Sequence, residues 1–338
     1  MSARALVAGA GGFIGHHMVK HLLKQGYWVR GVDIKAPEYE PSPAHEFELL
    51  DLRKWDNCLM ATRGVDEVYN LSADMGGIGY INYHHAESAG NNVLISTHLL
   101  EASRVNGAQR LFFASSACIY PQDKQNNPDV TPLKEEDAHP YDPDEGYGWE
   151  KLFTEKLCQY YHSDYGLETR VARFHNVYGP LGTYDGGREK APAAMCRKIA
   201  LAGDHGEIEV WGDGEQTRSF MYIDDCVNGV FQLMHSEHSS PLNLGNDRLV
   251  TINQLADIIA KIAGKSIGKH YNMTGPQGVR GRNSDNTLLR DVLSWEPEVS
   301  LGDGMRITYD WIWGELAKQG RANLPDPTAN TNLESRER

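Results

Sequence analysis

A glycine-rich loop close to the N-terminus is the feature that most restricts the possible folds of this chain. The run Gly9-Ala10-Gly11-Gly12-Phe13-Ile14-Gly15 stands between a short apolar stretch at 5–8 and a segment with helical spacing at 13–25. Glycines between a strand and a helix allow a tight turn, a close approach of the backbone to a pyrophosphate, and close packing of the helix on the strand. The loop therefore predicts a dinucleotide site that contains Gly9, Gly12, Phe13, Ile14 and Gly15.

An acidic residue stands at the end of the next predicted strand, at 27–33. The carboxylate of Asp33 can accept hydrogen bonds from both ribose hydroxyls and would repel a 2′-phosphate, so we expect NAD rather than NADP as cofactor. Lys35, which follows closely, weakens this expectation slightly. Asp51 ends the third predicted strand, and we expect it to contact the adenine, to cap the following helix, or to do both.

Strand and helix patterns alternate along the first half of the chain. The pattern predicts strands at 5–8, 27–33, 46–50, 67–71, 110–115 and 168–174, and helices at 13–25, 53–62, 88–106 and 147–165. Such alternation is typical of an α/β fold with a Rossmann-type, doubly wound parallel sheet. We expect an NAD-binding domain at 1–175 and a smaller C-terminal α/β substrate lobe at 176–320 that is interleaved with the sheet. The lobe has helical patterns at 190–202, 224–235, 252–264 and 301–318, and the polar segment 321–338 is expected to be a disordered tail.

Composition excludes several classes of function. A net charge of −13 argues against nucleic acid or an anionic membrane as a partner, and the chain has no apolar run of about 18 residues that would span a bilayer. Five irregularly spaced cysteines fit neither a disulfide framework nor a metal site. His16-His17 and His84-His85 are adjacent pairs that do not face each other on a helix, so we expect no bound metal. The N-terminus leads directly into a strand without a signal peptide, which predicts a cytoplasmic protein.

Tyr147 and Lys151 indicate the chemistry. They lie four positions apart on a predicted helix and therefore share a face. A nearby ammonium stabilises a phenolate and lowers the pKa of the tyrosine towards the range of a general base. This spacing is also common on solvated helix faces, but here a strand-borne Ser116 and a dinucleotide loop precede it. The order of these elements predicts a Ser–Tyr–Lys catalytic centre.

These motifs, with the run Gly212-Asp213-Gly214-Glu215-Gln216-Thr217-Arg218, resemble the extended short-chain dehydrogenase/reductase superfamily of NAD-dependent epimerases and dehydratases. Within it, three blocks resemble the GDP-mannose 3,5-epimerase family. They are Ala-Asp-Met-Gly-Gly-Ile-Gly at 73–79, Gly-Gly-Arg-Glu-Lys-Ala-Pro at 186–192, and Gly-Val-Arg-Gly-Arg-Asn-Ser-Asp-Asn at 278–286. The resemblance covers residues 4–316, and sibling 4-epimerases and dehydratases lack the three blocks.

A thiol close to Ser116 distinguishes this chain from a simple 4-epimerase. Period-2 strand geometry places Cys118 on the same face as Ser116, although a strand cysteine can also be plain core filler. A 4-epimerase needs no second acid or base, whereas a thiol and Lys190 in the pocket indicate proton transfer at carbons beside a ketone. The resemblance implies conversion of GDP-mannose to GDP-L-galactose or GDP-L-gulose. Tyr147 would begin a transient oxidation at C4, and Cys118 and Lys190, in either order, would act as base and acid at C5 and C3.

The resemblance also implies the residues that bind the GDP-sugar. Guanidinium groups are suited to the diphosphate, a substrate amide contact is expected from Asn176, and Gly76 would let the sugar approach the backbone. The expected substrate-binding residues are Gly76, Ser116, Cys118, Asn176, Glu189, Lys190, Gln216, Arg218, Arg280 and Arg282. His175 is expected to be a packing residue.

Other functions stay open at this point. The runner-up is another NAD-dependent sugar-nucleotide enzyme, either a 4-epimerase or a C5-selective epimerase. A non-catalytic NAD-binding regulator is a third possibility, which an intact Ser116, Tyr147 and Lys151 argue against. We also expect a homodimer joined through the predicted helices 88–106 and 147–165, because Val93, Leu94, Leu99 and Leu100 exceed what one buried face needs.

Overall fold

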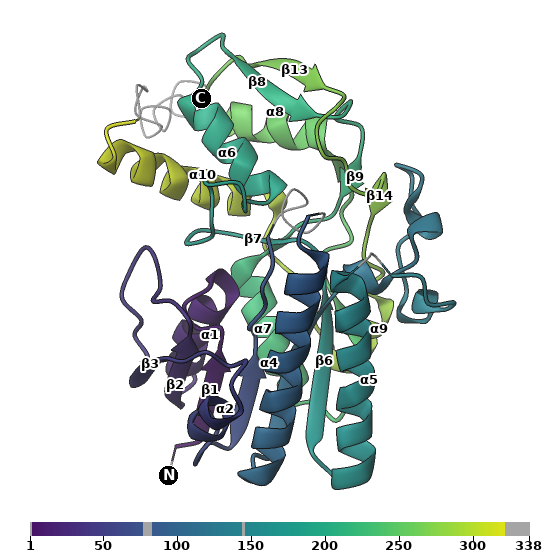
Figure 1. The fold of residues 1–338 in the computed structure, drawn as a ribbon. Helices are drawn as coiled ribbons and strands as arrows, with labels where there is room; N and C mark the ends of the chain where they lie inside the picture. Colours follow the sequence, from purple (N-terminus) through teal and green to yellow (C-terminus); the bar gives the residue numbers. More distant parts are fainter. Residues whose placement is uncertain (1, 77–82, 144–145, 322–338) are drawn as a thin grey trace.

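A seven-stranded parallel sheet forms the centre of the molecule (Figure 1). The computed structural model describes residues 2–76, 83–143 and 146–321. The strand order of the sheet is β11-β6-β5-β4-β1-β2-β3, which is the doubly wound order with one added strand. The strands are β1 (Arg4–Ala8), β2 (Trp28–Asp33), β3 (Glu46–Leu49), β4 (Glu67–Asn70), β5 (Arg110–Ser116), β6 (Glu168–Phe174) and β11 (Leu242–Leu244).

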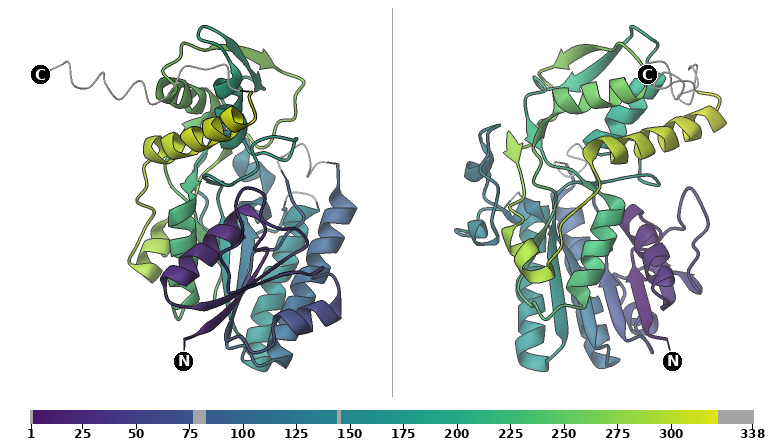
Figure 2. Two further views of the ribbon diagram at one scale, coloured as in Figure 1. Left: turned by 90° about the vertical axis from the view of Figure 1, so that its left-hand side faces the viewer. Right: turned by 180° about the vertical axis from the view of Figure 1, so that it is seen from behind.

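Helices cover both faces of the sheet, as the edge-on view in Figure 2 shows. One face carries α2 (Trp55–Ala61), α4 (His85–Val105) and α5 (Tyr147–Tyr165), and the other carries α1 (Phe13–Lys24) and α7 (Ile223–Met234). Strand β1 shows why both faces are apolar. Ala5 and Val7 belong to the core on the α1 side, whereas Leu6 and Ala8 belong to the core on the α4 side. Alternate side chains of one strand thus fill two cores, as a parallel sheet requires.

A smaller lobe sits above the carboxyl ends of the strands (Figure 1). Its helices are α6 (Ala191–Leu201), α8 (Ile252–Ile262) and α10 (Leu301–Lys318). Its strands are short: β7 (Val177–Tyr178), β8 (Glu207–Trp211), β9 (Thr217–Arg218), β10 (Met221–Tyr222), β12 (Val250–Thr251), β13 (Gly268–Asn272) and β14 (Gly281–Arg282). The chain returns from this region to the sheet as α7 and β11, and α9 (Thr287–Leu293) packs beside β11. The carboxyl edge of a doubly wound sheet, where ligands bind, is therefore enclosed between the sheet and the lobe.

A segment from the first half of the chain also joins the lobe. Residues 117–138 leave the end of β5 as three short 3₁₀ helices, Ala117–Ile119, Gln122–Gln125 and Glu135–Ala138. Within it, the backbone of Leu133 donates to the Asn283 carbonyl at 3.0 Å and accepts from the Asp285 amide at 3.0 Å. The Thr217 hydroxyl donates to the Pro128 carbonyl at 2.5 Å. Figure 1 shows this 117–138 segment beside β14.

The predicted α/β fold class is confirmed, and each predicted helix and strand corresponds to an observed element within a few residues. The short lobe strands and α9 were not predicted. Helix α2 begins after Lys54, so the expectation that Asp51 caps it is wrong. Apart from Arg321, the expected disordered tail at 321–338 lies outside the described residues.

In the described part of the chain, no helix combines the length and apolarity needed to cross a bilayer. The same residues contain no cluster of three or more His, Cys, Asp and Glu side chains arranged to hold a metal ion.

A buried carboxylate holds the amino end of the sheet to α7. Glu67 at the start of β4 lies 3.1 Å from Nε2 of His235, and it accepts a hydrogen bond from Tyr69 at 2.9 Å. Arg110 is 3.6 Å away, and the hydroxyl of Tyr27 lies 2.9 Å from the same histidine nitrogen. The hydrogen bond with Glu67 and the one to the Phe231 carbonyl raise the pKa of His235 against the effect of burial.

We expect this pair to make stability depend on pH. The pKa of His235 is raised in the folded state, so its charge stabilises the fold fully below the ordinary histidine pKa of 6.5. That contribution is lost as pH rises through the raised value. His235→Gln should remove roughly 0.5 kcal/mol of this pH dependence, because solvent screens a partly exposed pair. Urea unfolding from mildly acidic to mildly alkaline pH measures it, and identical slopes in both proteins would contradict the assignment.

Candidate active site

The glycine loop forms a cradle at the carboxyl end of β1. A Cβ atom on Gly15 would overlap the carbonyl of Gly9, so the first turn of α1 packs directly on the loop. Gly9 has φ +85°, a conformation that favours glycine. Gly12 caps α1 without a side-chain hydrogen bond, which leaves the first backbone N–H groups of the helix for a ligand. With Phe13 and Ile14 opening the helix, the cradle fits a pyrophosphate.

Asp33 closes one side of this cradle. Its Oδ2 accepts from the Gly11 amide at 3.0 Å, and its Oδ1 accepts from the Lys35 amide at 3.2 Å. Burial raises the pKa of Asp33, against the effect of these two amides. Asp51 is engaged differently, since it accepts from the backbone and guanidinium of Arg53 at 2.9–3.0 Å.

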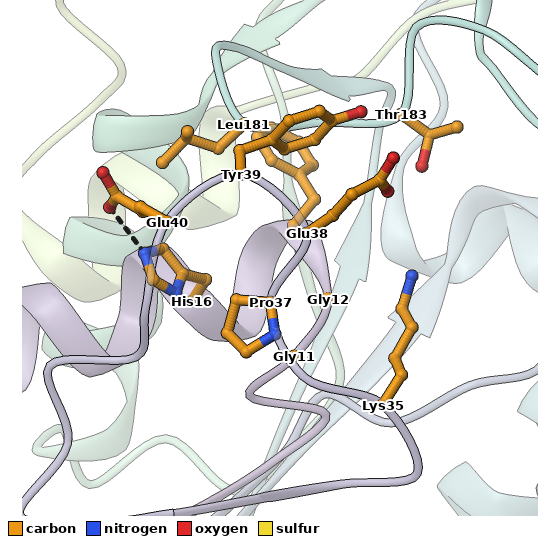
Figure 3. Close-up of a pocket in the computed structure, with 11 residues that line it drawn as sticks. Gly11, Gly12, His16, Lys35, Pro37, Glu38, Tyr39, Glu40, Leu181 and Thr183 are labelled. Carbon is orange, nitrogen blue, oxygen red and sulfur yellow. Dashed lines mark hydrogen bonds and ion pairs between the residues drawn. The ribbon is translucent and has the colours of Figure 1, made fainter.

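A pocket opens beside the cradle (Figure 3). Gly11 and Gly12 form part of its wall, and Lys35 extends along it. At one side of the pocket, His16 of α1 lies 2.7 Å from Glu40 and holds the loop after β2. The remaining lining residues are Phe13, Pro37, Glu38, Tyr39, Leu181 and Thr183.

The Ser–Tyr–Lys set comes together where β5 ends and α5 begins. Tyr147 and Lys151 are both buried, and the Lys151 ammonium lies 5.3 Å from the centre of the Tyr147 ring. Ser116 is close enough to lower the pKa of Tyr147, and the Tyr147 hydroxyl lies 4.0 Å from the sulfur of Met75. A Cβ on Gly148 would clash with the Cys118 carbonyl, so a glycine after Tyr147 lets α5 pack against the end of β5.

The structure does not show the expected effect of Lys151 on Tyr147. Burial raises the pKa of Tyr147 well above its usual value, and the charges of Glu150 and Cys118 raise it further. Lys151 also has a second buried neighbour, because Oε1 of Glu150 lies 3.6 Å from its ammonium and accepts from Asn92 at 2.9 Å. Burial raises the pKa of Glu150 as well.

Cys118 lies beside Ser116, although not for the predicted reason. The strand ends at Ser116, and Cys118 is in the 3₁₀ helix 117–119. Its amide donates to the Ser116 hydroxyl at 3.2 Å, which caps this helix and brings the two side chains together. The prediction of one strand face was therefore wrong, while the proximity is real. Arg282 of β14 donates from Nη1 to the sulfur of Cys118 at 3.4 Å.

Lys190 approaches the same thiol from the lobe. It is the residue that precedes α6, and as a whole it is exposed. Its ammonium is nevertheless desolvated, which lowers the pKa of Lys190, while the thiols of Cys118 and Cys226 act in the opposite direction. The ammonium of Lys190, just before α6, and the thiol of Cys118, just after β5, are therefore close enough to interact electrostatically.

The three blocks that carried the sequence resemblance meet here. Asp74 follows β4, and its amide is bound by Asn92 at 2.6 Å. Arg188 of the second block lies 3.6 Å from the Asp74 carboxylate. Gly76, two residues after Asp74, is buried. Residues 77–79 of the first block lie outside the described residues. The third block supplies Arg282.

The other expected substrate residues have protein partners in this structure. Arg280 forms a bidentate pair with Asp213 at 2.9 and 3.1 Å, and Arg218 donates to the carbonyls of Thr217 and Val279, both at 2.7 Å. Three more are placed by backbone contacts or an ion pair: Asn176 donates to the Ser219 carbonyl, Gln216 donates to the Trp211 carbonyl, and Glu189 accepts from Arg197.

His175 is a packing residue, as expected. It is fully buried, with Nε2 3.1 Å from Asn243 Oδ1, and burial lowers its pKa to about 3. Sequence reasoning missed Gln125 and Glu150. Gln125 lies in a segment without a motif, and Glu150 is an unspecified position between Tyr147 and Lys151, so only their burial marks them.

Comparison with known proteins identifies the family. Residues 5–245 match the NAD dependent epimerase/dehydratase family. The chain belongs to this family. It is 51% identical over 318 residues to GDP-mannose 3,5-epimerase 1 of Oryza sativa subsp. japonica, which covers 94% of this chain and 83% of the relative. It is 31% identical over 333 residues to UDP-glucuronic acid decarboxylase 1 of Xenopus tropicalis, with 96% and 76% covered.

Solved structures of the epimerase/dehydratase family have the same fold. UDP-glucose 4-epimerase of Thermotoga maritima with UDP-glucose has a TM-score of 0.82 at 28% identity, covering 93% of this chain and 99% of that one. UDP-glucose 4-epimerase of Thermus thermophilus in complex with NAD has a TM-score of 0.79 at 25% identity, covering 92% and 99%. The predicted superfamily and NAD as cofactor are thus confirmed. The glycine cradle and Asp33 are the residues of this chain that would hold it.

The position of Asp33 predicts the choice of cofactor. We expect the wild-type protein to bind NAD at least about tenfold more tightly than NADP, or ~1.4 kcal/mol, because the carboxylate would face the 2′-phosphate. Asp33→Ala should remove this preference, and Lys35→Ala should leave it in place. Calorimetric titration of both cofactors measures the ratio. Equal affinities in the wild-type protein would show that Asp33 does not contact the ribose.

Proposed function

We propose that this chain is an isomerase that converts GDP-mannose by inversion at C5, C3 or both, with transient oxidation and re-reduction at C4. The observation that carries the proposal is the contact of Arg282 with the sulfur of Cys118, next to Ser116 and Tyr147. Relatives named GDP-mannose 3,5-epimerase at 51% and 49% identity support the choice of substrate.

The oxidation step would use the Ser–Tyr–Lys set. NAD held by the glycine cradle and Asp33 would supply the hydride chemistry at C4. Ser116 would hold the C4 hydroxyl towards Tyr147, which takes its proton as the hydride leaves. Burial raises the pKa of Tyr147, so its phenol needs nearby positive charge to act as a base, and Lys151 is the buried cation beside its ring.

Proton transfer would then occur at the carbons beside the C4 ketone. A ketone acidifies the hydrogens on both neighbouring carbons, and inversion needs a base on one face and an acid on the other. Arg282 directs a cation at the sulfur, so we assign the role of base to Cys118. Lys190 would be the acid, because desolvation lowers its pKa and makes its proton easier to release.

A simple 4-epimerase is the second candidate function. The solved 4-epimerases share the fold at 25–28% identity. In a 4-epimerase the keto sugar would turn and take the hydride back on its other face. That reaction needs no second acid or base. The Cys118, Arg282 and Lys190 arrangement would have no task in it, so we favour inversion at C5 and C3.

Incubation with GDP-mannose in deuterium oxide tests the proposal. We expect solvent deuterium at C5, and at C3 if both centres invert, but none at C4, because the C4 hydrogen leaves and returns as hydride. NMR of the recovered nucleotide sugars gives the positions. Deuterium at C4 alone, or at no carbon, would exclude this mechanism.

The role of Cys118 is tested in the same assay. Cys118→Ala should slow exchange and epimerisation by about 10²–10⁴-fold, the usual range for a general acid or base. NAD binding should persist, since the glycine cradle is not touched. Cys58→Ala removes a buried thiol of α2 and serves as the matched control. Full activity of Cys118→Ala would return this thiol to a packing role.

We also propose that the protein is a homodimer. Large apolar side chains are exposed on neighbouring helices: Leu94 of α4 is 46% exposed, and Trp149, Phe153 and Tyr160 of α5 are 50–59% exposed. Figure 1 shows α4 and α5 side by side on the outer face of the sheet. Leu99 and Leu100 do not contribute, because both are buried in the monomer core, so that part of the sequence argument was wrong. If a second copy packed its own α4 and α5 against this face, the four helices would form a bundle.

We further propose a cytoplasmic location. All five cysteines are free thiols, which supports it.

Light scattering tests the dimer at micromolar concentration. We expect twice the chain mass for the wild-type protein and a monomer for Phe153→Glu, because a charge at the centre of an apolar contact is costly to desolvate. Tyr271→Glu changes an aromatic residue of β13 that is exposed elsewhere and is expected to stay dimeric. A wild-type monomer would refute the proposal.

A further inference from the structure

Gln125 is a buried amide that neither the motifs nor the proposed mechanism uses. It lies at the end of the 3₁₀ helix 122–125 and is completely inaccessible to solvent. Its Nε2 donates to the carbonyls of Tyr120 and Pro121 at 3.1 and 3.0 Å. Because both amide hydrogens are used in this way, its Oε1 has to face the opposite direction. The orientation of the amide is therefore fixed by the backbone of its own segment.

The oxygen of this amide holds Arg282. Nε of Arg282 donates to Gln125 Oε1 at 2.5 Å, and Nη1 of the same guanidinium donates to Cys118 Sγ at 3.4 Å. Arg282 comes from β14 in the lobe, whereas Gln125 and Cys118 both belong to the 117–138 segment. The planar guanidinium is thus held at two points of one segment. Its fixed fork geometry means that anchoring Nε also fixes where Nη1 points.

We propose that Gln125 is a positioning residue that keeps Arg282 on the sulfur of Cys118, so that the guanidinium assists proton abstraction by that sulfur. The proposal deepens the proposed function and rests on Cys118 as the base. Without the amide oxygen, the guanidinium would lose the contact that sets its orientation and could turn away from the sulfur. The sulfur would then be a weaker base and a weaker nucleophile, because this cation would no longer be directed at it.

Alkylation of Cys118 reports on this arrangement without any substrate. The four other cysteines are buried, and Cys118 is the one that is partly accessible, so iodoacetamide should modify it selectively in the folded protein. We expect Gln125→Met to slow this alkylation near neutral pH by about three- to tenfold, because only the thiolate reacts. The rate should recover at alkaline pH. Peptide mass spectrometry of the modified protein identifies the site.

Three comparisons make the test specific. Gln122→Met alters an exposed residue of the same short helix and should leave alkylation unchanged. In an Arg282→Met background, Gln125→Met should have no further effect if it acts through the guanidinium. In the deuterium assay, Gln125→Met should slow exchange at C5 and C3 by a similar factor, while the affinity for NAD stays the same.

Unchanged alkylation in folded Gln125→Met, or an equal slowing in the Arg282→Met background, would overturn the inference. Where circular dichroism shows that Gln125→Met does not fold, Arg282→Lys is the second variant. A single ammonium cannot contact Gln125 and Cys118 in the same fork, so alkylation should again slow, and an unchanged rate would refute the proposal. If alkylation depends on Gln125 but GDP-mannose undergoes no exchange, the positioning role stands and the proposed substrate fails.

Discussion

A buried ion pair between α5 and β6 is the interaction on which the geometry of the site depends. Arg173 donates from Nε and Nη2 to the two carboxylate oxygens of Glu155, at 3.0 and 2.8 Å. The hydroxyl of Ser115 donates to the same carboxylate at 2.5 Å. Helix α5 is thereby fixed on the ends of β5 and β6, and Tyr147 and Lys151, nearer the start of that helix, are held at Ser116. Removing one partner of such a pair typically costs about 3–5 kcal/mol, because the other charge stays buried alone.

The same arginine connects the sheet to the substrate side of the site. Nη1 of Arg173 donates to the Glu135 carbonyl at 2.8 Å and to the Tyr120 hydroxyl at 3.2 Å, both in the 117–138 segment. The Tyr120 hydroxyl donates in turn to Asn243 of β11 at 2.6 Å. Cys118 and Gln125 lie in this segment, so the network that fixes the hydride-transfer residues also fixes the proposed base. Both halves of the reaction therefore share one buried scaffold.

The sequence allowed the sheet and the cofactor cradle to be predicted because their signals are local. A buried parallel strand must be apolar on both faces, and a strand–loop–helix turn around a pyrophosphate needs glycine, so 5–15 could be interpreted without any distant contact. The Ser116, Tyr147 and Lys151 set was also predictable, since strand and helix periodicity place them at one end of the sheet. Leu99 and Leu100 were misassigned because apolar content on a helix does not reveal which face another part of the chain covers.

The rest of the site depends on contacts between distant segments. Strand periodicity gave the wrong reason for the position of Cys118, because the amide of a 3₁₀ turn competes for the Ser116 hydroxyl and ends the strand. Gln125 could not be predicted, since its partner Arg282 is separated from it by most of the lobe. The same holds for Glu150, whose carboxylate meets Asn92 of another helix.

Glu150 shows how the two proton-transfer centres differ. The phenol of Tyr147 and the thiol of Cys118 each lie near a cation, but the cation near Tyr147 is shared with a buried carboxylate at 3.6 Å. The guanidinium near Cys118 is held by the Gln125 amide, which directs Nη1 at the sulfur. Burial and the charge of Glu150, in contrast, keep the pKa of Tyr147 high, so the phenol needs further positive charge nearby before it can act as a base. Such a requirement suits an epimerase that oxidises first, because hydride transfer should begin only when the cofactor and sugar are both in place.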